Sequence, residues 1–215
     1  ARLKPAGGGK EIAPVTPKDA DAKDELQSIA FPTPLPENTT FQLTLPAGVR
    51  DMSGRSLSNA SMFPLTVRTG VAPPIAKFAA APFGMLEREA EGPALLPLTL
   101  RHVQGDLRPA APAGRVLQQR FDQSDAELLR AYAKVRKLDQ DEWASRKAPM
   151  LDARTAKRLD LPVLLGGDPR PFEVIGVPLA EPGYHVVELQ SQRLGASLLE
   201  PAAPMYVRTG VLVTN

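Results

Sequence analysis

Proline is the residue that most restricts the fold of this chain, because 23 of its 215 residues are prolines. That share is roughly twice the usual one. Each proline ring removes a backbone donor and clashes with the preceding helical turn, so this density argues against a mostly helical protein. Short strands joined by proline turns accommodate it better. The length suffices for one large β domain or two smaller ones, each able to bury a core.

The first strands are indicated by alternation of apolar and polar residues. FQLTLP at 41–46 alternates at period two, which is typical of a strand with one buried face. MFPLTVRTGV at 62–71 resumes the pattern after a polar segment in which Asp51 and Gly54 are placed for a turn. The two strands therefore predict a hairpin or an adjacent pair. Residues 1–30 carry too little apolar surface to fold alone and indicate an irregular segment or a long loop.

A domain boundary is indicated by the paired prolines of VAPPIAKFAAAP at 71–82, which favour extended backbone with few hydrogen bonds. The predicted division is an N-terminal β domain at 1–75, in part irregular over 1–28, a second β domain at 76–210, and the start of a further domain at 211–215. The chain opens at Ala1 without an initiator methionine, which indicates a processed chain or a fragment.

The second predicted domain has its own set of strands. They are expected at 82–87, 94–103, 115–121, 161–165, 172–177, 184–190 and 205–213. Within ALLPLTLRHV at 94–103, Pro97 predicts an edge strand or a bulge, because proline cannot donate to a ladder.

One helix is predicted between these strands, inside a helical insertion near 123–159. Ser124 and Glu127 form an S-x-x-E pattern, in which side chains satisfy free backbone donors of the first turn. An apolar stripe at helical spacing follows, formed by Leu128, Leu129, Tyr132, Val135 and Leu138. We expect this stripe to lie against a sheet. A second helical turn or two is expected between 139 and 159, around the single tryptophan, Trp143.

The pentapeptide VRTGV occurs twice, at 67–71 and at 207–211, each time in a strand-like apolar run that follows a proline. Repetition at the scale of a domain is what a tandem array predicts. Each copy therefore marks either a catalytic element or the closing strand of one of two successive domains.

Two glycine-rich stretches have simple structural explanations. GGGK at 7–10 resembles part of a phosphate-binding loop, but no strand is predicted before it and Glu11 stands where a serine or threonine should hold magnesium. A flexible linker explains it better. GGDPRP at 166–171 could form an anion loop with Arg170, yet a tight turn between strands accounts for every residue in it.

His102 and His185 are the only side chains expected to shuttle protons near neutral pH. Each is predicted singly inside a strand, without a cysteine, histidine or carboxylate cluster at ligand spacing. Structural histidines are the better interpretation. The sequence therefore predicts no catalytic, cofactor-binding or metal-ligating residues, and hence no cofactor and a protein that is not an enzyme.

Charge and cysteine content exclude further classes of protein. The 26 basic and 24 acidic residues nearly cancel, which makes nucleic-acid binding a weak hypothesis despite a pI near 9.0. The chain has no cysteine, which removes disulfides and thiolate sites from it. No apolar run approaches the roughly 20 residues of a membrane span.

The order of these segments resembles a known family. LPENTTFQLTLPAGVRDMSGRSLSNASMFPLTVRTGVAPPIAKFAAAPFG is similar to the junction of the first two domains of bacterial alpha-2-macroglobulins. GPALLPLTLRHV, LPVLLGG, PGYHVVELQS and PMYVRTGVLVTN resemble the macroglobulin-like domain that follows. The resemblance covers about residues 29–215 and rests on whole-domain pattern. It implies tandem macroglobulin-like antiparallel β-sandwiches of the Ig-like, fibronectin type, with a helical insertion in the second.

The resemblance also implies a function. Members of this family are periplasmic proteins, usually lipoproteins anchored to the inner membrane outside the stretch resembled here. They cage proteases after bait cleavage, and many bond the protease through a thioester between a cysteine and a glutamine. A chain without cysteine cannot hold that thioester, and no functional residue is carried over. These domains are then expected to have a structural role in holding the domain array together. Proteases and a penicillin-binding peptidoglycan synthase are expected as partners of the full-length protein.

Two other hypotheses stay open. Tandem sandwiches also serve as periplasmic or surface scaffold and adhesion modules, and fold alone does not fix function. An enzyme with a site formed between domains has the least support. A much longer parent chain with a cysteine-x-glutamate-glutamine motif would favour the trap, and short repeats with an anchor would favour the scaffold.

Overall fold

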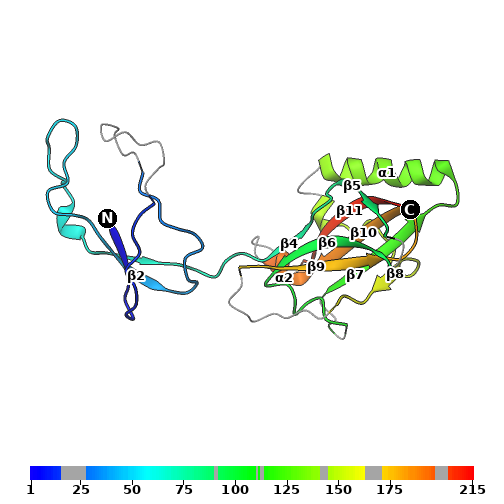
Figure 1. Ribbon diagram of the computed structural model, residues 1–215, viewed down its shortest axis with the longest axis horizontal. Helices are drawn as coiled ribbons and strands as arrows, with labels where there is room; N and C mark the ends of the chain where they lie inside the picture. The colour runs from blue at the N-terminus through cyan, green and yellow to red at the C-terminus, as the bar shows by residue number, and fades with distance from the viewer. Residues whose placement is uncertain are drawn as a thin grey trace. The chain divides into compact units, whose positions relative to one another are not determined.

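Strands dominate the computed structural model of the chain (Figure 1), as the proline content predicts. The structure describes residues 1–15, 28–89, 92–109, 111, 114–140, 145–162, 171–196 and 203–215. The chain divides into two units, Ala1–Ala72 and Pro73–Asn215. The division lies three residues before the boundary placed at 75 from the sequence.

The described residues of the first unit form one antiparallel sheet. Its strands are β1 (Arg2–Pro5), β2 (Thr40–Thr44) and β3 (Leu65–Arg68), in the order β1-β2-β3, and a short 3-10 turn, η1 (Ala60–Met62), precedes β3. The pairing gathers the apolar residues onto one face, with Leu43 between Leu3 and Leu65, and Phe41 between Pro5 and Val67. Strands β2 and β3 confirm the pair of strands predicted around Asp51 and Gly54.

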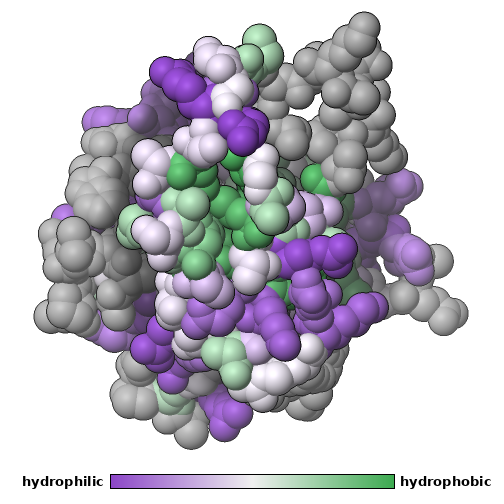
Figure 2. Space-filling model, turned by 90° about the vertical axis from the view of Figure 1, so that its left-hand side faces the viewer, coloured by the Kyte–Doolittle hydropathy of each residue, from purple (hydrophilic) through white to green (hydrophobic). Residues whose placement is uncertain are grey.

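Burial on this sheet is uneven across the strands. Phe41 is fully buried and Leu3 nearly so, whereas Leu65 and Val67 are each 37% exposed. Apolar side chains also reach the surface elsewhere in this unit, among them Val15, Ile29, Met52 and Met62, and Figure 2 shows apolar side chains among polar ones on the face that it draws. The sheet alternates as the sequence predicts, but each of β1 and β2 has one deeply buried side chain and β3 has none.

The second unit is a β-sandwich of two sheets (Figure 1). The three-stranded sheet has the order β4-β6-β9, with β4 at Ile75–Phe78, β6 at Ala94–Arg101 and β9 at Glu173–Leu179. The five-stranded sheet has the order β5-β11-β10-β7-β8, with β5 at Phe83–Glu87, β11 at Met205–Thr214, β10 at Gly183–Ser191, β7 at Gly114–Phe121 and β8 at Lys157–Leu159. Neighbouring strands are antiparallel, except that β5 runs parallel to β11.

The core lies between these two sheets and follows the period of two. Alternate residues of β6 are buried: Ala94, Leu96, Leu98 and Leu100. They pack in one cluster with Ile175, Val177 and Leu179 of β9, Val187 and Leu189 of β10, and Val211 and Val213 of β11. Each strand thus gives one face to the core, as expected for packed sheets.

The chain passes from one sheet to the other between β4 and β5. Gly210 in β11 donates its N–H to the Pro82 carbonyl at 2.8 Å, and the Thr209 hydroxyl donates to the carbonyls of Ala80 and Pro82. These bonds hold the crossing segment against β11. Prolines in this segment therefore mark a change of sheet within the second unit, just after the unit boundary.

Pro97 does not lie in an edge strand, which corrects the sequence-based prediction. It belongs to β6, the middle strand of its sheet. The Pro97 carbonyl accepts from the Ala79 N–H at 3.0 Å, so the backbone groups of this residue face the β4 side. The β4–β6 ladder ends at the pair Phe78–Leu98. The next pair would need an N–H from Pro97, and the ladder stops before it. No bond to β9 is lost, because residue 97 does not face β9.

The predicted helix is confirmed as α1 (Asp125–Gln140). The Ser124 hydroxyl oxygen accepts from the Glu127 N–H at 3.2 Å and caps the first turn. The helix lies on the outer face of the five-stranded sheet (Figure 1), where Ala131 and Val135 are buried in a second apolar cluster with Tyr184 and Val186 of β10.

One member of the predicted stripe is misplaced. Leu129 is 62% exposed, and Tyr132 is 39% exposed with its ring stacked on Phe83 at a centroid distance of 4.2 Å. The stripe that meets the sheet runs through Leu128, Ala131, Val135 and Leu138, at positions i, i+3, i+7 and i+10. Ala131 takes the place expected for Leu129, because successive helical residues are about 100° apart and Leu129 therefore lies on the side of the helix away from this stripe.

This corrected stripe gives a direct prediction for stability. We expect Leu129→Asp to change the free energy of unfolding by less than about 0.5 kcal/mol, because the side chain is in solvent. Val135→Ala should cost about 1–2 kcal/mol, since it removes two buried methyl groups. Urea unfolding followed by circular dichroism measures both. A large loss of unfolding free energy in Leu129→Asp would show that Leu129 is buried against the sheet after all.

The second helical turn or two expected between 139 and 159 corresponds to one 3-10 turn, η2 (Ser145–Lys147), and the same stretch also holds a strand that was not predicted, β8, which pairs with β7. Two further expectations differ from the structure. Residues 211–214, assigned to a following domain, belong to β11 and pair with β10. The strand expected at 161–165 is not seen at Leu161, and its residues from 163 onward lie outside the described part of the chain, as does Trp143. Strands predicted at 82–87, 94–103, 115–121, 172–177, 184–190 and 205–213 are confirmed as β5, β6, β7, β9, β10 and β11.

Candidate functional site

GGGK forms a turn that does follow a strand, contrary to the expectation from sequence. β1 ends at Pro5, and Gly8 and Gly9 take positive φ values of 89° and 131°. The chain then returns so that Leu3 and Ile12 exchange backbone hydrogen bonds of 3.0 and 2.8 Å. A phosphate-binding loop leads into a helix, whereas this turn leads into an antiparallel bridge. Residues 166–170 of the other glycine-rich stretch lie outside the described residues.

His102 is not inside a strand, which corrects the prediction for it. It follows the last residue of β6, has a φ of 57° and is exposed. Its carbonyl accepts from Arg193 Nη1 at 3.3 Å. The left-handed backbone marks the turn that ends the strand. His102 therefore contributes a turn conformation to the fold.

A buried aspartate organises that same turn. Asp106 is 7% exposed and accepts from the Ser191 hydroxyl at 2.9 Å and from the Arg193 N–H at 2.8 Å. The Arg193 Nε lies 3.3 Å from the other carboxylate oxygen. These bonds join the turn after β6 to the start of α2 (Gln192–Ala196). The cluster fixes two turns to each other.

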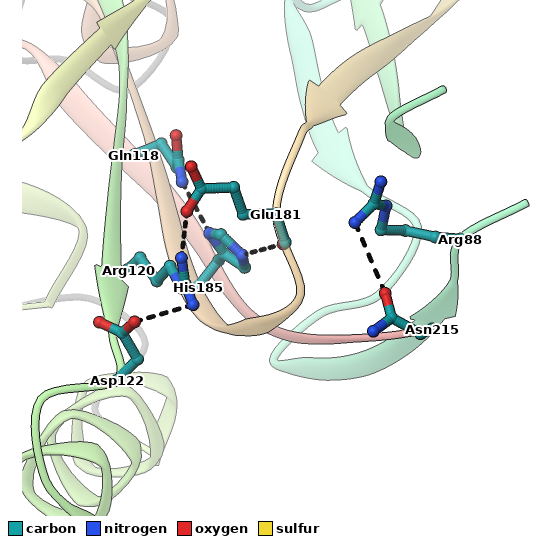
Figure 3. Close-up of polar contacts among 7 residues, drawn as sticks. All are labelled: Arg88, Gln118, Arg120, Asp122, Glu181, His185 and Asn215. Carbon is teal, nitrogen blue, oxygen red and sulfur yellow. Dashed lines mark hydrogen bonds and ion pairs between the residues drawn. The ribbon is translucent and has the colours of Figure 1, made fainter. Parts of the chain in front are cut away.

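His185 lies within β10 as predicted, on its core-facing side and 1% exposed. Its ring nitrogens have two different partners (Figure 3): Nε2 is 2.8 Å from the Glu181 carbonyl oxygen, and Nδ1 is 2.6 Å from Gln118 Nε2. A carbonyl can only accept, so Nε2 carries the proton and Nδ1 accepts from the Gln118 amide. Burial lowers the pKa of His185 from its ordinary value of 6.5, with the positive charge of Arg120 acting in the same direction.

The nearby carboxylates are bound to arginine (Figure 3). Arg120 of β7 pairs with Asp122 at 2.8 Å and with the carboxylate of Glu181. Glu181 therefore uses its carboxylate for Arg120 and its backbone carbonyl for His185. General acid–base catalysis by histidine needs a partner that orients the ring and a reacting group within reach. Here the ring joins β7 to the turn between β9 and β10, beside a polar hollow of about 360 Å³.

This geometry predicts how stability depends on pH. The pKa of His185 is lowered in the folded state, so between about pH 6.5 and that lowered pKa the unfolded chain binds more protons. Stability should therefore fall as the pH falls below 6.5. We expect His185→Gln to flatten this part of the curve of unfolding free energy against pH. An identical curve for His185→Gln and the parent chain would contradict the assignment.

A buried ion pair was not predicted from the sequence. Glu188 and Arg208 have side chains 2% and 8% exposed, and Arg208 Nε donates to Glu188 Oε2 at 3.1 Å. The Glu188 carboxylate also accepts from the backbone N–H groups of Met150 at 2.7 Å and Leu151 at 3.2 Å. Glu188 follows Tyr184 and Val186 at every second position on the helix side of β10, where side chains are buried. A charged residue at a position expected to be buried is the sequence signal that could have revealed the ion pair.

Comparison with known proteins does not assign the chain. Neither the protein-family models nor the curated proteins give a match. Within the described ranges, no group of three or more histidine, aspartate or glutamate side chains is arranged to hold a metal ion. In the same ranges, no helix is long and apolar enough to cross a membrane.

Proposed function

We propose that this chain is a non-catalytic, frame-forming part of a bacterial alpha-2-macroglobulin-like protein, a broad-spectrum protease inhibitor that traps proteases in the periplasm. The observation that carries the proposal is the position of the repeated VRTGV. Val67 and Arg68 end β3, the last strand of the first unit, and 207–211 lie in β11, the last strand of the second. Two consecutive β units that end in the same sequence are what a tandem array of related domains predicts.

The topology of the second unit supports an Ig-like macroglobulin module. Its sheets have three and five strands, and its first strand is split into β4 and β5 so that each sheet receives one part. The last strand, β11, lies between β5 and β10. Ig-like sandwiches share this two-sheet architecture with chain ends at neighbouring strands. The helix α1 follows β7, in the position that the family resemblance assigns to an insertion.

The chemistry of the polar clusters also supports a structural role. Asp106, His185 and Glu188 bond to turns, loops, arginines and neighbouring strands of the same unit. Clusters of this kind fix the positions of loops at the ends of a sandwich. In a protein that rearranges when its bait region is cut, rigid domains of this kind would move as units and so transmit the rearrangement along the array. Contacts with the protease, the membrane (through a lipid anchor) and the cell-wall synthase would be made by the full-length protein.

The test is a comparison of two substrates. The full-length parent protein is mixed with a broad-specificity protease, and the remaining cleavage of a small peptide substrate is compared with that of a large protein substrate. We expect cleavage of the peptide to survive and cleavage of the protein to be lost, because a caged protease stays accessible only to small molecules. Survival of both activities would overturn the trap and favour a scaffold or adhesion module.

A further inference from the structure

A groove of about 550 Å³ lies on the second unit, beside strand β4. Its walls come from β4, the first half of β11, the end of α1 and η2. Partly buried apolar side chains line it, including Ile75, Leu138 and Val207. It is separate from the His185 cluster, which shares none of its lining residues.

Strand β4 presents backbone groups along this groove. It is an edge strand, since the order of its sheet is β4-β6-β9. The Ala79 N–H donates to the Pro97 carbonyl on the β6 side, so alternation directs the backbone groups of Ala76 and Phe78 to the opposite, outer side. Among the residues that the structure describes, no strand pairs with this outer edge. An edge of alternating donors and acceptors is complementary to one kind of ligand, an extended peptide backbone.

The charges around the groove further restrict the kind of segment that could bind there. Lys77 and Arg146 are exposed at its rim, and Asp139 is the acidic residue of the described lining. A second copy of the chain paired through β4 would bring Lys77 close to its own equivalent, and like charges at paired strands destabilise. An acidic peptide would instead complement the two cations.

We infer that this groove binds an extended segment of a partner protein, in which apolar residues alternate with acidic or polar ones, by adding it as a strand to the outer edge of β4. The apolar side chains of the segment would enter the groove on the core-facing side of β4, beside Ala76 and Val207. Its acidic or polar side chains would lie on the opposite face, beside Lys77. Main-chain hydrogen bonds supply affinity in this mode of recognition, and alternate side chains supply specificity.

The probe for this inference is a fluorescent nonapeptide, blocked at both ends, with valine at alternate positions and glutamate or threonine between. Fluorescence anisotropy with the 215-residue chain should show saturable binding that weakens with salt. Ala76→Pro should weaken it at least about tenfold, since it removes an outward N–H and adds a ring at the edge. Lys77→Glu should weaken it as well.

A matched control uses the other edge of the same sheet. Gly176 pairs with Pro97, whose backbone groups face β4, so Val174 and Gly176 of β9 direct their backbone groups outward, as Pro178 does. Val174→Pro should therefore leave binding unchanged while imposing the same kind of substitution on an edge strand. If Val174→Pro weakens binding as much as Ala76→Pro, the site is not at β4.

A second control changes the peptide and leaves the protein intact. N-methylation of alternate peptide amides removes the donors that would pair with β4 but keeps the side chains and charges. We expect the methylated peptide not to bind. Equal binding of both peptides, or no saturable binding of the unmodified peptide at millimolar concentration, would overturn the inference.

Discussion

Replacing Glu188 with alanine should lower the free energy of unfolding of the second unit by about 3–5 kcal/mol. The substitution leaves the guanidinium of Arg208, whose side chain is 8% exposed, without its carboxylate partner. It also removes the acceptor for the N–H groups of Met150 and Leu151. Loss of one member of a buried pair is costly because the remaining charge stays in a medium of low polarity.

The control separates the unpaired charge and the lost volume from the loss of the hydrogen bonds to residues 150 and 151. The double variant Glu188→Leu with Arg208→Met replaces both charges with apolar side chains of similar size, and such replacements are often neutral or stabilising. We expect it to be clearly more stable than Glu188→Ala in urea unfolding. Equal destabilisation of the two variants would show that the bonds to residues 150 and 151, and not the unpaired charge, account for the loss.

The strands of the second unit could be predicted because their pattern is local. Alternation in β6, β10 and β11 decides which residues face the core, and the capping pattern at Ser124 predicts where α1 begins. Two errors have different causes. Pro97 is tolerated in a middle strand only because the adjoining ladder stops one residue earlier, which the sequence of β6 alone does not show. The predicted stripe places Leu129 on the wrong face of the helix: successive residues are about 100° apart, so it lies away from the stripe through Ala131 and Val135.

The polar clusters could not be predicted, because each depends on residues far apart in the chain. His185 meets Gln118 across 67 positions, and Asp106 meets Ser191 across 85. Pairing of β10 with β7 brings the first two together, and the register of that pairing is not visible in either strand alone. Only the charge of Glu188 among buried positions left a trace in the sequence.

The second large effect concerns the glycine of the repeated VRTGV. Gly210→Ala should lower the free energy of unfolding of the second unit by about 1–3 kcal/mol, the usual cost of overpacking. A methyl group at Gly210 would overlap the hydroxyl of Tyr184 and stand 2.9 Å from Cδ1 of Phe83. Tyr184 is 6% exposed, and burial raises its pKa to about 12. Its ring has little room to move, since Phe83 is itself stacked on Tyr132.

The first copy of the same pentapeptide supplies the matched control, because no atom of the described residues lies within 4 Å of the position that a methyl group would take at Gly70. Gly70→Ala should therefore change stability by less than about 0.5 kcal/mol. Thermal unfolding followed by circular dichroism measures both variants, each against the parent chain. The same loss in both would mean that this glycine serves backbone conformation in each unit. A loss in Gly210→Ala alone would mean that a shared sequence has acquired a packing role only where α1 and β5 cover the last strand.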